Sequence, residues 1–114
     1  MPDIDWDALN RALYSKIVEH KAQAVWYEAE AMMREAVPNY CGSLDAAVAA
    51  LNALGLSYTP VVGHGIPHVT VEIPRLGAYE TRYATDTTPA ALATALVRAA
   101  LALLEREEEN DETC

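Results

Sequence analysis

Histidines, cysteines and glutamates are the residues whose types and spacing could do chemistry in this sequence. His64 and His68 flank a turn that contains Gly65 and Pro67. A histidine pair four positions apart can bind a metal ion on a helix, but glycine and proline exclude a helix here. No carboxylate at a suitable spacing completes a metal-ligand set around this pair. His20 lies inside a predicted helix, where a packing or interface role is favoured over metal binding. We therefore expect no metal site and no cofactor.

The two cysteines form no recognisable motif. Cys41 comes shortly before a predicted helix, where the pKa of a thiol can be lowered, and Cys114 is the last residue. Without a Cys-x-x-Cys pattern, neither a zinc site nor a redox motif is indicated. We interpret Cys41-Gly42-Ser43 as the start of a helix rather than as a nucleophile elbow. A small hydrolase that uses Cys41 is the least favoured alternative.

Two glutamates could form a carboxylate pair. Glu72 and Glu80 lie on neighbouring predicted strands and could face each other, as the acid and base of a hydrolase do. No substrate-binding residues accompany them, so a solvated sheet face with Arg82 as the counter-ion is the favoured interpretation. We expect no catalytic residue and no enzymatic activity.

The net charge of −9 restricts the partners of the chain. Binding to a nucleic-acid backbone requires clustered lysine and arginine, whereas Lys16 and Lys21 are the only lysines and the arginines are scattered. Direct binding to nucleic acid or to an anionic membrane is therefore not expected. The start of the sequence lacks the basic and apolar regions of a secretion signal, and no run of about 18 apolar residues could span a bilayer. We expect the cytoplasm.

The sequence predicts an α+β protein in three parts. A long N-terminal helix occupies residues 1–37, an α-β-β-β-α two-layer domain with a three-stranded antiparallel sheet occupies 38–105, and an acidic disordered tail occupies 106–114. In the central domain Ser43 should cap a helix, and Thr88-Pro89 should open the last one.

The three predicted strands alternate in side-chain character. Pro60 cannot donate a ladder hydrogen bond, so the first strand should lie at an edge of the sheet. In the third strand Tyr79, Thr81 and Tyr83 share one face, with Glu80 on the other, and we expect one of the two faces to be buried.

The first helix is predicted to be longer than the domain needs. At 1.5 Å per residue, a helix that ends before Pro38 would be about 50 Å long. It could bend near residues 26–28 and fold back on its own domain. We favour self-association, because its apolar face is too wide for one sheet. The expected interface residues are Trp6, Leu13, Ile17, His20, Ala24 and Tyr27.

One stretch of the sequence resembles a known family. Pro38, Tyr40, the run Ser43–Ala47 and the start of the last helix at Thr88–Leu92 are similar to the phage ABA-sandwich domains. The resemblance covers about residues 37–104 and implies a phage or prophage accessory protein in the cytoplasm of a bacterial host. It supplies no activity, because the family has no established chemistry.

These patterns favour a non-enzymatic binding protein that forms a homo-oligomer. Its more specific form is a counter-defence protein that sequesters a host signalling nucleotide, a small anionic ligand, with His64, His68, Arg75 and Arg82 as the contacts. The alternative is an acidic decoy that imitates nucleic acid and binds a host protein.

Overall fold

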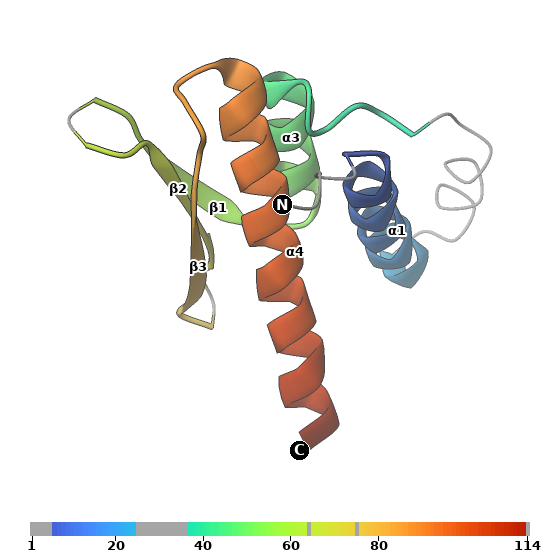
Figure 1. Cartoon of the computed structure of the whole chain (residues 1–114). Helices are drawn as coiled ribbons and strands as arrows, with labels where there is room; N and C mark the ends of the chain where they lie inside the picture. Colours follow the sequence, from blue (N-terminus) through green and yellow to red (C-terminus); the bar gives the residue numbers. More distant parts are fainter. Residues whose placement is uncertain (1–5, 25–36, 64, 75, 114) are drawn as a thin grey trace.

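The computed structural model describes residues 6–24, 37–63, 65–74 and 76–113 (Figure 1). It confirms the predicted α+β class. The elements are α1 (Trp6–Ala24), α3 (Leu44–Ala53), β1 (Ser57–Val61), β2 (His68–Ile73), β3 (Ala78–Tyr83) and α4 (Pro89–Thr113).

The sheet is antiparallel with the strand order β1-β2-β3, so the prediction that Pro60 lies in an edge strand is confirmed. Helix α4 packs against β2 and β3, α3 packs on α4, and α1 packs on α3 and α4. All three helices lie on the same side of the sheet (Figure 1). One face of the sheet is therefore covered by helices, and no described element covers the other.

The covered face, which we call the inner face, is set by β2. Val69, Val71 and Ile73 are buried against the helices, and the register places Glu80 of β3 opposite Val71. Tyr79 and Tyr83 therefore lie on the uncovered, outer face, where their exposed fractions are 62% and 67%.

Our interpretation of the face that carries Glu80 and Arg82 as solvated was therefore wrong, but the expected role of Arg82 as the counter-ion of Glu80 is confirmed by a contact of 2.8 Å. β3 must take its register from the apolar residues of β2, and a shift by one residue would turn every side chain to the opposite face.

Local signals delimit α3 as predicted. The Ser43 hydroxyl accepts a hydrogen bond from the Ala46 N–H at 3.3 Å, which is an N-cap. At the other end Gly55 has a φ of 73°, and the Leu56 N–H donates to the Leu51 carbonyl at 3.0 Å. This is a Schellman ending, in which glycine adopts the left-handed conformation without a steric penalty.

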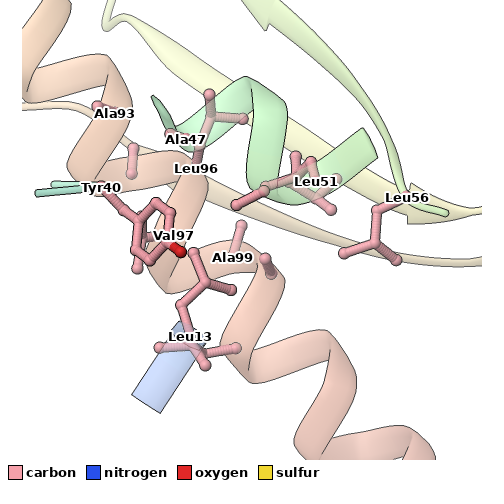
Figure 2. Close-up of a cluster of buried hydrophobic side chains, with 14 of the residues drawn as sticks. Leu13, Tyr40, Ala47, Leu51, Leu56, Ala93, Leu96, Val97 and Ala99 are labelled. Carbon is pink, nitrogen blue, oxygen red and sulfur yellow. The ribbon is translucent and has the colours of Figure 1, made fainter. Parts of the chain in front are cut away.

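Helix α4 forms the centre of the core. Leu96, Val97 and Ala99 belong to one buried cluster with Leu13 of α1 and Leu51 of α3 (Figure 2). Alanines on α4 leave room for the neighbouring elements to approach. Burial of each large apolar side chain contributes about 1.5–3 kcal/mol.

Helix α1 buries one face within its own chain. Leu13 and Ile17 of the expected interface are buried in the core, so these two side chains are covered without a second chain. Trp6 and His20 are exposed. The side chain of Ala24 and the whole of Tyr27 lie outside the described residues, as does the predicted continuation of this helix over residues 25–36.

Helix α4 is longer than the sequence predicts. It continues to Thr113, through most of the segment 106–114 that we expected to be a disordered tail. Its C-terminal part extends beyond the sheet (Figure 1). Among the described helices, none combines the length and apolar character needed to cross a membrane.

Candidate functional site

A cleft of about 630 Å³ opens where α1, the turn before α3, the segment after β3 and the start of α4 meet. Its described lining includes Trp6, Tyr83 and the charged residues Asp7, Asp86 and Arg98. Trp6 is 53% exposed, whereas the Tyr83 ring lies against His68 on the outer face of the sheet. The cleft thus combines an apolar ring with charged groups.

The polar floor of the cleft is built around the backbone of Cys41. The Asn10 Oδ1 accepts a hydrogen bond from the Cys41 N–H at 2.9 Å, and the Thr94 hydroxyl lies 3.0 Å from the Cys41 carbonyl oxygen, to which it can donate. The Asn10 Nδ2 donates to the Asn39 Oδ1 at 3.2 Å. Side chains from α1 and α4 therefore hold the turn on both sides.

Asn10 was not identified from the sequence as a site residue. Its exposed fraction is only 6%, and it lies four positions after Trp6 and three before Leu13, on the same helical stripe. A polar residue within an apolar stripe indicates a buried hydrogen bond, and this signal could have identified it.

The Cys41 thiol is unsuited to act as a nucleophile. The residue is 1% exposed, and burial raises the pKa of its thiol, although a hydrogen bond with Thr94 acts in the opposite direction. An activated cysteine needs an accessible site and a lowered pKa. These observations argue against the hydrolase that uses Cys41.

The carboxylate pair that we considered does not form. Glu72 is opposite Tyr79 in the ladder and Glu80 is opposite Val71, so the two glutamates lie on opposite faces of the sheet. The Glu80 carboxylate instead pairs with the guanidinium groups of Arg82 at 2.8 Å and Arg106 at 3.2 Å. Facing carboxylates, the less favoured alternative, are excluded, because Glu72 shares a face with the directly opposite Tyr79 and side chains alternate between the two faces along a strand. The expected role of Arg82 as the counter-ion is confirmed.

Two of the expected nucleotide contacts, His68 and Arg82, lie on opposite faces of the sheet. His68 lies opposite Tyr83 on the outer face, whereas Arg82 lies opposite Val69 on the inner face. The rings of His68 and Tyr83 meet edge to face, with their centroids 5.7 Å apart. His64 and Arg75, the other two expected contacts, lie outside the described residues.

Charge at the cleft is dominated by carboxylates. Asp86 accepts hydrogen bonds from the Thr88 hydroxyl and the Thr88 N–H, and these bonds lower its pKa. Among the described lining residues, Asp7 and Asp86 oppose a single guanidinium, that of Arg98. The cleft therefore favours a cationic group over an anionic one.

No group of three or more His, Cys, Asp or Glu side chains within the described part of the chain could hold a metal ion. No protein-family model, no curated protein and no solved structure matches this chain.

Proposed function

We propose that this chain is a non-enzymatic binding protein that holds a small ligand, or one side chain of a partner, in the cleft beside Trp6 and Cys41. The observation that carries the proposal is the cleft of about 630 Å³ with its hydrogen-bonded floor. Ligand sites in proteins enclose about 300–1,000 Å³ and combine apolar walls with a few fixed polar groups.

The chemistry of the lining favours a ligand with a flat or apolar body and an amine. Trp6 offers a ring face that can attract a cation, and Asp7 and Asp86 can accept hydrogen bonds from an ammonium group. Arg98 can donate to a carbonyl or carboxylate on the same ligand. This balance disfavours a host signalling nucleotide, whose phosphates would meet two carboxylates.

Calorimetry tests this proposal on the full chain. Tryptamine and spermidine serve as cationic probes, and a cyclic dinucleotide serves as the anionic comparison. We expect heat from a cationic probe and none from the nucleotide. Asp7→Asn should weaken binding about tenfold, as expected for the loss of one charge-assisted contact. The matched control is Asp45→Asn, an exposed carboxylate of α3 that does not line the cleft. No heat from either cation would overturn the proposal.

The cellular setting is also proposed rather than established. The resemblance to phage ABA-sandwich domains supports a phage or prophage accessory protein in the cytoplasm of a bacterial host. The caps at Ser43 and Thr88 carry part of that resemblance, and they are features of local structure. They support the fold more strongly than they support the origin.

A second candidate function is the acidic decoy. Residues 105–112 carry six acidic side chains in the sequence EREEENDE, and α4 remains helical through this run. A helix fixes the spacing of its charges better than a disordered tail does, which favours recognition by a basic groove. Deleting residues 105–114 should abolish the binding of a basic host protein if the decoy is correct. Unchanged binding partners after cross-linking would exclude it.

A further inference from the structure

We propose that two copies of this chain join through the edge of β3, as an antiparallel β3–β3 ladder centred on Thr81. The inference deepens the proposed function, on which it rests for the expectation that the chain acts by binding. It names the partner as a second copy of the same chain. It uses a different surface from the apolar stripe of α1, much of which is buried in the chain's own core.

The direction of the backbone groups of β3 follows from one hydrogen bond. The Ala84 N–H donates to the Pro67 carbonyl at 2.9 Å, so the backbone groups of Ala84 point toward β2. Because the direction of the backbone groups alternates along an antiparallel strand, those of Glu80 and Arg82 also point toward β2. Tyr79, Thr81 and Tyr83 therefore direct their N–H and C=O groups away from the sheet.

The pairing of Thr70 with Thr81 independently supports this assignment of the backbone directions along β3. Their hydroxyl oxygens are 2.9 Å apart across the strands. Directly opposed side chains come closest at the ladder positions that do not exchange backbone hydrogen bonds. Thr81 is therefore at a position whose backbone groups are available on the outer edge of β3, where no described strand pairs with it.

The sequence of β3 is complementary to itself when it is read antiparallel. With Thr81 opposite the partner's Thr81, Tyr79 meets the partner's Tyr83, and each of these pairs exchanges two backbone hydrogen bonds. On the inner face, Glu80 meets the partner's Arg82. The two-fold axis repeats this ion pair on the other side, as a self-complementary interface requires.

Neighbouring registers are unfavourable. Only every second residue of β3 directs its backbone groups toward the partner. The nearest alternative registers therefore pair each residue with one that lies two positions away along the partner strand. A shift in one direction places Glu80 opposite the partner's Glu80, and a shift in the other places Arg82 opposite the partner's Arg82. Like charges directly opposite each other destabilise a ladder. Charge therefore selects the register centred on Thr81.

The other edge of the sheet is blocked. Since Val69 and Val71 point their backbone groups toward β3, Thr70 points toward β1 and pairs with Thr59. By alternation Pro60 is directed toward the open edge of β1, where it has no N–H to donate. Proline on an edge strand is a common protection against pairing, and the described part of β3 contains none.

Arg82 already pairs with Glu80 of its own chain at 2.8 Å, and Glu80 would have to share its carboxylate with the partner's Arg82. Among the described side chains, Arg106 competes with the proposed ladder for a backbone carbonyl. Its Nη2 donates to the Tyr79 carbonyl, which in the dimer would accept the N–H of the partner's Tyr83. Arg106 must release this carbonyl when the copies pair, while its contact with Glu80 at 3.2 Å can remain. Each copy thus exchanges one side-chain hydrogen bond for a set of backbone bonds.

Charge reversal in two variants gives the sharpest test. Glu80→Arg should place arginine opposite the partner's Arg82, and Arg82→Glu should place glutamate opposite the partner's Glu80. Each variant alone should be monomeric by sedimentation equilibrium, whereas the original chain is a dimer. A mixture of the two should restore the dimer, because each arginine then faces a glutamate. Circular dichroism checks that both variants are folded. A monomeric original chain, or a mixture that stays monomeric, would overturn the proposal.

A cross-link keeps the proposal testable if the charge variants do not fold. In the paired edges the two Thr81 Cα atoms would lie about 5.5 Å apart, which a disulfide can span. In a Cys114→Ser background, Thr81→Cys should form a covalent dimer on mild oxidation. Thr59→Cys, at an exposed position of β1, should not. Equal cross-linking of both would overturn the interface.

The interface and the proposed function can fail separately. The three residues substituted on β3 do not line the cleft. Binding heat measured with a monomeric chain would therefore overturn the interface and leave the proposed function intact.

Discussion

Asn10 and Cys41 are 31 positions apart, yet the Asn10 side chain accepts the Cys41 N–H at 2.9 Å in a buried setting. This bond fixes the turn that precedes α3 against α1. It also forms the floor of the candidate cleft, so the position of α1 and the shape of the cleft depend on the same side chain.

Asn10→Ala should lower the free energy of unfolding by about 1–3 kcal/mol, because the buried Cys41 N–H then has no acceptor. Urea unfolding followed by circular dichroism measures this change. The matched control is Asn52→Ala on α3, whose side chain is exposed. An equal loss in both variants would show that the Asn10 bond makes no special contribution.

Gly42→Ala should also be destabilising, for a steric reason. A Cβ added at Gly42 would clash with the Asn39 Nδ2 and lie 2.9 Å from its Cγ. Asn39 would have to move, and its Oδ1 would lose the hydrogen bonds from Asn10 and from the Gly42 N–H. We expect a loss of about 1–3 kcal/mol.

The double variant Gly42→Ala/Asn39→Ala supplies the control for this prediction. Removing the Asn39 side chain removes the clash, so the two losses should not add, and a coupling of about 0.5–3 kcal/mol is expected. Strictly additive losses in urea unfolding would show that the clash is relieved in another way.

The elements of the fold were predictable because their signals are local. Ser43 and Gly55 delimit α3, Pro60 places β1 at an edge, and Thr88 caps α4 through its hydroxyl, which accepts the Ala91 N–H at 3.3 Å. Each of these residues acts on a backbone group within a few positions of itself. Sequence alone can therefore show them.

The arrangement of side chains in the site was not predictable in the same way. Whether Glu80 or Tyr79 faces the helices depends on the pairing of β3 with Val71 of β2, and the alternation within β3 is the same in both cases. The burial of Leu13 depends on where α1 docks. Both are contacts between distant segments, for which a single sequence gives no register.

Cys41 should react slowly in the native protein. Because burial raises the pKa of its thiol and covers the sulfur atom, alkylation requires the turn to open. In a Cys114→Ser background, iodoacetamide should modify native Cys41 far more slowly than Cys41 in urea. Modification at the same rate in both conditions would contradict the buried position of Cys41 and would support a role for its thiol as a nucleophile.

Tyr40 should make the protein sensitive to alkaline pH. Burial raises the pKa of its phenol from 10.0 to about 12, with a smaller contribution from Tyr14. The folded state then holds the phenol proton more tightly than the unfolded state, so the stabilisation is fully present below pH 10 and is lost as the pH rises toward about 12. The shift corresponds to a loss of up to about 3 kcal/mol, since one pKa unit is worth about 1.4 kcal/mol.

Tyr40→Phe isolates this effect because it removes the ionising group and keeps the ring. Urea unfolding of both proteins, from neutral pH to the alkaline range, should show a smaller loss of stability in the variant. Tyr79→Phe is the control, since Tyr79 is exposed on the outer face of the sheet. If both variants lose stability in parallel with the original chain, alkaline unfolding arises from other groups, and the Tyr40 phenol is more accessible to water than its buried position in the core implies.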